Sequence, residues 1–283
     1  IKGIKWHNGD ELKANDIAFT MKKGCETAIT KYIWGAIDPD SIEIIDEYTL
    51  RVSTFEPAPA LLALMTALPA SILNEKYVTE VGDGSGTAPI GTGPYKFVEW
   101  SRGNSITLER FDDYHGETPD VSKVVFRFIP EATNRTIELE SGICDLAYEI
   151  QTSDLSRVAD NPDLTLFSGI SNSVRYIGFN CQKAPFDNVA VRQAIASAIN
   201  IEGIVNAVKM GKGVVATNPI APDIKYFNDD IKLRPYNPEG AKAALAAAGY
   251  SNGLSTTIWV DEQKERVDIA TILQSQLAEI GVN

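Results

Sequence analysis

Apolar residues recur along the chain with two different spacings, which predict helices and strands in alternation. A repeat of three or four residues, typical of a helix that buries one face, predicts helices over residues 14–25, 188–198, 201–210 and 269–280. Patterns typical of strands run over residues 41–46, 48–53, 95–100, 105–110, 123–129, 144–150, 174–180 and 256–260. Because the two kinds of element interleave, the sequence predicts an α/β or α+β fold.

Glycine and proline residues mark where these elements begin and end. Pro130 is expected to open a helix that Gly142 ends, and Pro238 to open another that stops at Gly249. The run Gly-Asp-Gly-Ser-Gly-Thr at residues 82–87 predicts a loop or a boundary between lobes.

The charge of the chain narrows the class of partner. Among its 283 residues, 38 acidic side chains outnumber 26 basic ones, which gives a net charge of -12. A negative surface opposes binding to nucleic acid phosphates and to anionic membrane surfaces, so neither partner is expected. The length suffices for two lobes, since single hydrophobic cores stop growing near about 250–300 residues. No stretch reaches the roughly 20 apolar residues of a membrane span.

The residue types that usually carry catalysis form no known motif. His7 and His115 lie far apart in the sequence and are expected to be structural or surface residues. Cys25, Cys144 and Cys181 lack the spacing of a metal site and are expected as small apolar side chains. One pair of them can form a disulfide, a question that the sequence leaves open. The motifs of serine hydrolases and of nucleotide-binding loops are absent from the sequence. We therefore expect no catalytic residue, no metal and no cofactor, and a protein that is not an enzyme.

Neither end of the sequence has the features of a natural terminus. No initiator methionine or signal peptide stands at Ile1, and the last residues follow directly on a predicted helix. We therefore expect an internal piece of a longer protein, in which a missing signal carries no information about compartment.

Four segments of the chain carry a pattern that is distinctive as a set. They are Lys5-Trp6-His7-Asn8-Gly9 with Leu12 and Asp16; Pro89-Ile90-Gly91-Thr92-Gly93-Pro94-Tyr95-Lys96-Phe97 with Trp100 and Leu108-Glu109-Arg110; Ile177-Gly178-Phe179-Asn180 with Ala184-Pro185-Phe186-Asp187 and Val191-Arg192-Gln193-Ala194; and Tyr236-Asn237-Pro238-Glu239 with Ala248-Gly249-Tyr250. In this order, and over essentially the whole chain, they resemble the extracellular solute-binding proteins of peptide and nickel ABC importers, a family that includes oligopeptide- and dipeptide-binding proteins.

This resemblance implies a two-lobed clamshell of the periplasmic-binding-protein kind, with an extra small domain and with the solute held between the lobes. It implies that residues 1–87 belong to the accessory domain, residues 88–179 to part of the first lobe and residues 180–283 to the first half of the second lobe. By the same likeness the fold is incomplete at both ends, so that the chain carries only part of a binding site.

The resemblance also places three pairs of residues beside the family's cleft. They are Tyr32 and Trp34 after the first helix, where peptide binders place an aromatic residue; Tyr148 and Gln151 at the end of a first-lobe strand; and Ser173 and Arg175 in the segment that crosses to the second lobe. The guanidinium of Arg175 can pair with a solute carboxylate through its fork of donors, or it can be an ordinary surface cation.

The function that the resemblance implies is the capture of dipeptides or oligopeptides outside the cell and their delivery to an ABC permease. The expected protein is a monomer in the periplasm or a lipoprotein on the cell surface. Within the same fold the solute can instead be a nickel chelate, an oligosaccharide, an opine, haem or another small molecule, and a peptide-sensing surface receptor is a further alternative. A hydrolase would need a nucleophile or paired carboxylates in the cleft, and no spacing in the sequence singles out either.

Overall fold

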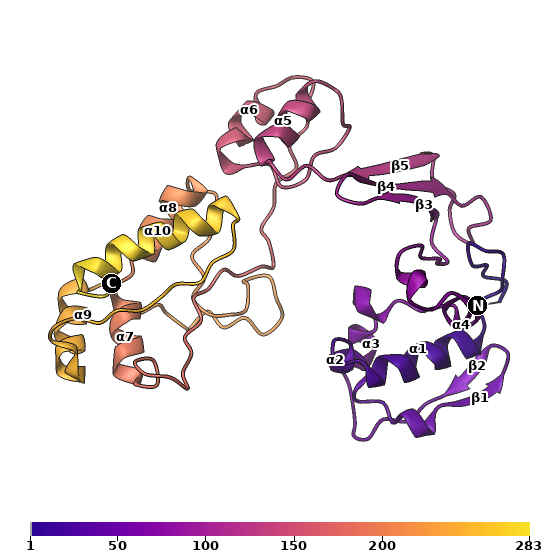
Figure 1. Cartoon of the computed structure of the whole chain (residues 1–283), viewed down its shortest axis with the longest axis horizontal. Helices are drawn as coiled ribbons and strands as arrows, with labels where there is room; N and C mark the ends of the chain where they lie inside the picture. Colours follow the sequence, from indigo (N-terminus) through magenta and orange to yellow (C-terminus); the bar gives the residue numbers. More distant parts are fainter. Residues whose placement is uncertain (1) are drawn as a thin grey trace. The chain divides into compact units, whose positions relative to one another are not determined.

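The computed structural model describes residues 2–283, which form two compact units (Figure 1). The first unit ends at Pro130, and the second comprises Glu131–Asn283. Helices and strands interleave in the first unit, whereas helices and irregular extended segments make up the second. The predicted mixed class is therefore confirmed. The division after Pro130 does not coincide with the predicted domain boundaries at 87/88 and 179/180, which remain predictions.

The first unit centres on helix α1 (Ala14–Glu26), which packs against a hairpin and two other helices (Figure 1). The hairpin consists of β1 (Glu43–Asp46) and β2 (Thr49–Arg51), which pair antiparallel, as the patterns at 41–46 and 48–53 predict. The remaining short elements are α2 (Lys31–Trp34), α3 (Leu61–Leu64), α4 (Glu75–Val81) and the 3₁₀ turns Pro39–Ser41, Leu68–Ala70 and Gly82–Gly86. The last of these turns occupies the segment predicted as a loop.

The core beneath α1 consists of side chains from several short segments. Burial of each large apolar side chain stabilises the fold by about 1.5–3 kcal/mol, which gives these short elements a stability that they would lack alone. The buried members are Met21, Ile33, Trp34, Ile37 and Ala70.

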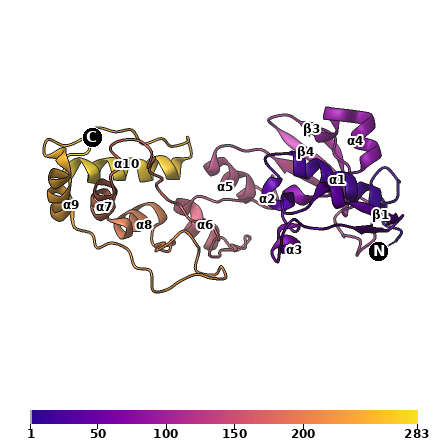
Figure 2. The same ribbon diagram turned by 90° about the horizontal axis from the view of Figure 1, so that it is seen from below.

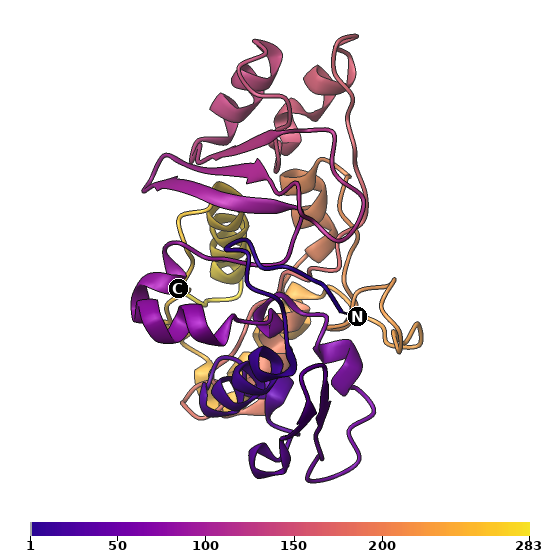
Figure 3. The ribbon, with the colours of Figure 1, turned by 90° about the vertical axis from the view of Figure 1, so that its right-hand side faces the viewer.

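A three-stranded antiparallel sheet completes the first unit. Its strands β3 (Tyr95–Ser101), β4 (Ser105–Arg110) and β5 (Lys123–Arg127) follow one another in the order β3-β4-β5, and Figure 3 shows them as one layer. Leu108 of β4 lies opposite Phe97 on one side and Val124 on the other. The three strands predicted for this region are therefore confirmed.

The carboxylate of Asp16 ties together three segments of the first unit. Its Oδ2 accepts hydrogen bonds from the indole Nε1–H of Trp6 at 3.3 Å and from the backbone N–H of Lys13 at 3.1 Å. Its Oδ1 accepts the backbone N–H of Glu75 at 2.9 Å. Asp16 and Trp6 are both buried. The N-terminal segment, the first turn of α1 and the start of α4 therefore share one buried acceptor.

His7 fastens the N-terminal segment to the residues that precede β3. Its backbone N–H donates to the carbonyl of Gly91 at 2.9 Å, and the N–H of Gly91 donates back to Nδ1 of the ring at 3.1 Å. The Nε2 atom lies 3.0 Å from the carbonyl oxygen of Gly93. Because Nδ1 accepts, Nε2 carries the hydrogen and the ring is neutral. His7 is thus the structural histidine that we expected, and it joins the first two of the four resembling segments.

Four helices of the second unit contribute side chains to one core, and their labelled ribbons appear in Figure 2. They are α7 (Val189–Ser197), α8 (Ile201–Lys209), α9 (Pro238–Leu245) and α10 (Lys264–Glu279). Asn188 and Asn237 begin α7 and α9, because each side-chain oxygen accepts a backbone N–H of the first turn at 2.9 Å. Gly249 ends the turn after α9 with a φ of 97°, which a residue without a side chain adopts most readily. The apolar faces predicted for α7 and α10 are confirmed: the buried residues include Val191, Ala194, Ile195, Ala198, Leu273, Leu277 and Ile280.

Two further helices of the second unit are joined by polar contacts. They are α5 (Ala132–Glu140), where Pro130 and Gly142 predict a helix, and α6 (Leu155–Ala159). The fully buried hydroxyl of Thr136 donates to Oδ2 of Asp154 at 3.2 Å. Arg157 pairs with the carboxylate of Glu140 through two nitrogens, with Nε 2.6 Å from Oε1. These contacts fix α6 against α5.

The strands predicted at residues 144–150, 174–180 and 256–260 do not form within the part of the chain that the structure describes. An alternating pattern becomes a strand only where a neighbouring strand takes up its backbone hydrogen bonds. In the described second unit the only isolated bridge pairs Leu254 with Val282. Large apolar side chains on these segments, including Tyr176 and Trp259, are therefore exposed. For this chain the prediction of these three strands is wrong.

We predict that replacing Asp16 by alanine destabilises the first unit by about 3 kcal/mol, since the substitution leaves several buried donors without an acceptor. The measurement is urea unfolding followed by tryptophan fluorescence. Asp40→Ala is the matched control, because Asp40 is an exposed acidic residue of the same unit, and surface substitutions stay within about 0.5 kcal/mol. Equal midpoints for the two variants would contradict the role assigned to Asp16.

A second prediction concerns the loss of stability at acidic pH. Burial lowers the pKa of His7 below its ordinary value of 6.5, and the nearby Lys96 lowers it further, while the hydrogen bond to Gly93 opposes the shift. A histidine with a lowered pKa binds its proton more readily in the unfolded chain. The stability that it contributes is therefore present above pH 6.5 and is lost as the pH falls through the lower folded pKa.

The free energy of unfolding of the natural chain should accordingly decrease more between pH 7.5 and pH 5.5 than that of His7→Gln. We choose these two pH values because they flank the ordinary histidine pKa of about 6.5. His115→Gln, which alters an exposed histidine, should keep the pH dependence of the natural chain. Identical pH profiles for the natural chain and His7→Gln would refute the prediction.

Candidate functional site

The first predicted pair of site residues lies on α2, and its two members differ completely in exposure. The ring of Tyr32 is 59% exposed, whereas Trp34 is 1% exposed and belongs to the core. The thiol of Cys25 donates to the backbone carbonyl of Trp34 at 3.4 Å, and Gly24 of α1 lies against the indole ring. Tyr32 therefore has an exposed side chain, whereas Trp34 supports the helix from the core.

The second pair lies in the segment that follows α5. Tyr148 is 78% exposed. Gln151 precedes the 3₁₀ turn Thr152–Asp154, its Nε2 donates to Oγ1 of Thr133 at 3.3 Å, and its Oε1 lies 3.5 Å from the hydroxyl of Ser153. The backbone between them is held by Arg135, whose Nη2 donates to the carbonyl of Glu149 at 3.0 Å. Tyr148 is thus an exposed aromatic side chain, and the amide of Gln151 is held by its own hydrogen bonds.

The third pair lies in the irregular segment before α7. Ser173 has an exposed side chain, and its backbone N–H donates to the hydroxyl of Ser171 at 3.0 Å. The Nε of Arg175 lies 3.8 Å from Oε1 of Glu265, at the start of α10. Oε2 of the same carboxylate lies 2.5 Å from Nζ of Lys209, at the end of α8. Arg175 therefore belongs to a three-residue charged cluster: Arg175, Lys209 and Glu265.

Sequence reasoning missed two members of this charged cluster. Lys209 lies on a predicted helix and Glu265 lies just before the predicted helix at 269–280, and both are far from Arg175 in the sequence. No spacing signal connects the three positions, and only the packing of α8 against α10 brings them together. Gln151 donates a hydrogen bond to Thr133, whereas Arg175 lies near Glu265, so these two predicted site residues have different neighbours.

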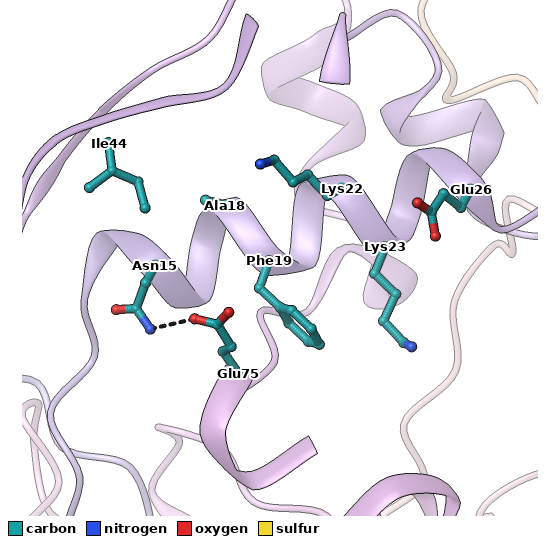
Figure 4. A pocket seen from close by; sticks show the side chains of 8 residues that line it. All are labelled: Asn15, Ala18, Phe19, Lys22, Lys23, Glu26, Ile44 and Glu75. Atoms are coloured by element: carbon teal, nitrogen blue, oxygen red, sulfur yellow. Dashed lines mark hydrogen bonds between the residues drawn. The ribbon is translucent and has the colours of Figure 1, made fainter. Parts of the chain in front are cut away.

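Two hollows of moderate size lie within single units, and neither is lined by a predicted site residue. The first, of about 310 Å³, lies along α1 (Figure 4), where the side-chain amide of Asn15 donates to Oε2 of Glu75 at 2.8 Å. The figure shows Phe19 beside this pair and Lys22 and Lys23 further along the helix. The second, of about 500 Å³, lies where α9 meets the residues around Gly253 and Gly281. These hollows carry no chemistry that marks them as a solute site.

Within residues 2–283, the structure gives little support for a reactive thiol or a bound metal ion. Within the described residues, none of Cys25, Cys144 and Cys181 forms a disulfide. Burial raises the pKa of the Cys25 thiol, with a smaller contribution from Glu26, which disfavours the reactive thiolate. No group of three or more histidine, cysteine or acidic side chains in this range is placed to hold a metal ion. No helix among these residues has the length and apolar composition to span a bilayer.

Comparison with known proteins gives a consistent result over the whole chain. Residues 2–283 match the family model described as "Bacterial extracellular solute-binding proteins, family 5 Middle". The chain is 31% identical to heme-binding protein A of Haemophilus influenzae and 30% identical to the dipeptide-binding protein of Escherichia coli K12, with 99% of the chain covered in each case. It spans 56% and 58% of the length of these two relatives.

Among solved structures, the chain is similar to the ABC transporter-associated periplasmic binding protein DppA of Helicobacter pylori in complex with the peptide STSA. The TM-score is 0.91 at 28% identity, and the alignment covers 100% of this chain and 60% of that one. This similarity supports the periplasmic-binding-protein kind of fold over the part that is shared. The two lobes and the extra domain of the predicted clamshell remain predictions.

The packing of Gly24 against Trp34 generates a prediction. A Cβ atom at position 24 would lie 2.2 Å from Cδ1 of Trp34, so one of the two must shift. We expect Gly24→Ala to destabilise the first unit by about 1–3 kcal/mol from overpacking, despite a gain in helix propensity of up to about 1 kcal/mol.

Gly86→Ala is the control, because no atom lies within 4 Å of the added Cβ at that position. The measurement is thermal unfolding followed by circular dichroism. If Gly24→Ala were as stable as the control, the indole of Trp34 would not be the fixed support of α2 that we describe.

Proposed function

The chain belongs to family 5 of the bacterial extracellular solute-binding proteins, and from this membership we propose that its protein is the substrate-binding component of an ABC importer. The proposed role is to capture dipeptides or oligopeptides outside the cell and to deliver them to the permease. The family is one of solute-binding proteins, in agreement with the prediction that the chain is not an enzyme.

One observation carries the peptide proposal. The backbone of the whole chain follows a peptide-bound periplasmic binding protein with a TM-score of 0.91. A dipeptide-binding relative of 30% identity adds support from sequence. Since both similarities cover only part of the longer proteins, the solute and the partner are proposals about the complete protein.

The proposed mechanism is closure of one lobe against another around the solute. A solute shifts the open and closed populations only by its differential affinity for the closed state, and a change from 1:99 to 99:1 needs about 5.5 kcal/mol. Backbone amides of a peptide can supply this through several hydrogen bonds of about 1 kcal/mol each, with little dependence on side chains. The permease then distinguishes the closed from the open protein, and the solute leaves unchanged.

Exposed aromatic and polar side chains are the residues that we assign to the solute. The rings of Tyr32 and Tyr148 offer large, stiff surfaces for stacking, and Trp34 supports the first of them. Gln151 and Ser173 offer neutral hydrogen-bonding groups, and Arg175 offers a charged fork for a carboxylate.

A second candidate solute class follows from the relatives. The heme-binding relative and the dipeptide-binding relative are almost equally identical to this chain, at 31% and 30%. A small solute other than a peptide is therefore the alternative that a specific observation favours. Dipeptides, longer peptides and haem share carboxylate groups, which Arg175 could bind in each case.

The family description also bears on location and partners. We propose that the protein works outside the cytoplasm, as a periplasmic protein or a surface lipoprotein, and acts as a monomer that docks on its permease. The acidic charge of the chain suits a carrier that does not bind nucleic acid.

We predict that the gently purified full-length gene product retains short peptides of mixed sequence. The measurement is native mass spectrometry of the protein, followed by sequencing of the released solute. Incubation with a pool of free peptides should leave those peptides intact, because the family is one of solute-binding proteins.

A single defined small molecule in place of peptides would replace the peptide assignment by the second candidate. A protein that retains nothing and ignores the peptide pool would contradict the carrier function. Turnover of the pool above background would contradict the assignment to a protein that is not an enzyme.

A further inference from the structure

The charged cluster of the second unit has an arrangement that the proposed function does not yet use. Glu265 lies in the first turn of α10, between Lys209 on one side and Arg175 on the other. Its side chain is 30% exposed, and that of Arg175 is 52% exposed. Lys209 lies close enough to Oε2 for a charge-assisted hydrogen bond, whereas Arg175 lies 3.8 Å from Oε1, beyond hydrogen-bonding distance.

The charges of the cluster leave one positive charge uncompensated. Two cations face one carboxylate, so the cluster carries a local charge of +1 in a chain whose net charge is -12. Lys209 already satisfies Oε2 of Glu265. The excess charge therefore resides mainly on the more exposed guanidinium, where an anionic group is the complementary partner.

The geometry of Arg175 leaves its terminal fork open. The Nε atom is the guanidinium nitrogen that lies 3.8 Å from Glu265, and no side-chain hydrogen bond from Arg175 is found within residues 2–283. A guanidinium offers one edge through Nε and a second edge through its two terminal nitrogens, and the second edge matches a carboxylate with two parallel hydrogen bonds. Oε1 of Glu265 is buried and accepts no hydrogen bond. A small movement of Arg175 would therefore let this oxygen accept a hydrogen bond from Nε.

We propose that Glu265 is a positioning residue: it holds Arg175 from the Nε side, so that the terminal fork faces the carboxylate of the bound solute. Lys209 keeps Glu265 in place by occupying the other carboxylate oxygen. This inference rests on the proposed function, because Arg175 needs a carboxylated solute as its partner.

The test compares peptides that differ only in this carboxylate. The probes are a pool of free-acid peptides of two to five residues and the same pool with amidated C-termini. Native mass spectrometry of the full-length gene product gives the apparent Kd for each pool. Arg175→Ala should weaken binding of the free-acid pool by about 10- to 100-fold, the loss of a charge-assisted hydrogen bond, and should change binding of the amide pool little.

Glu265→Gln should weaken binding of the free-acid pool by about 2- to 5-fold, the size expected for a partly exposed ion pair. Glu265→Asp should restore part of this loss, since it keeps the charge. Glu262→Gln is the matched control, because it removes an exposed carboxylate from the same segment and should leave both constants unchanged. Arg175→Lys keeps the charge without the fork and should behave like a weaker Arg175→Ala.

The outcomes separate this inference from the proposed function. Equal losses for the acid and amide pools in Glu265→Gln would make Glu265 a purely structural residue and overturn the inference. Tighter binding of the acid pool by Glu265→Gln would show that Glu265 competes with the solute, which also overturns it. A natural protein that binds neither pool overturns the peptide function, and the inference with it.

Discussion

A single buried carboxylate determines how the first unit is assembled. An ionised group in the interior is unfavourable unless hydrogen bonds replace its lost water. Asp16 meets this requirement with donors from three different segments, so its oxygens are satisfied only when all three are in place. Trp6 is one of these donors, and the next residue, His7, forms hydrogen bonds with Gly91 and Gly93. The entry to the three-stranded sheet is therefore fixed through the same short N-terminal segment.

The elements that could be predicted are those whose signals are local in the sequence. Helices α7 and α9 have an asparagine at the first turn and an apolar repeat behind it, and both signals lie within about three turns. Strands β3, β4 and β5 pair with the strands next to them in the sequence, so their pairing partners were also local. The segments at 144–150, 174–180 and 256–260 carry the same kind of pattern but have no ladder partner within residues 2–283. An alternating pattern of apolar and polar residues indicates a preference for a strand, but it does not identify the strand with which the segment would pair.

The residues of the candidate site were assigned by resemblance and remain predictions, whereas the environment of each residue could not be predicted from the sequence. The aromatic pair on α2 was placed by resemblance, yet the burial of Trp34 depends on Gly24, which leaves room for the ring on a different helix. Likewise, the sequence offered two interpretations of Arg175, a solute ligand or a surface cation. Glu265, which is distant in the sequence, lies near Arg175 but does not fully neutralise its positive charge. Such contacts depend on which helix faces pack together, and that information is spread over the whole sequence.

A carrier must bind its solute firmly and still release it, and the chemistry of the described residues suits that requirement. Groups that react with a solute have a pKa shifted toward the reactive form, whereas burial shifts the pKa of Cys25 away from the thiolate. The charged cluster is partly exposed, so a solute carboxylate would exchange water for protein at modest desolvation cost. A deeply buried ion pair would favour retention over release. If Arg175 binds the solute as proposed, its partial exposure, with Glu265 behind it, would combine recognition of an anion with ready release, which a transport cycle needs more than maximal affinity.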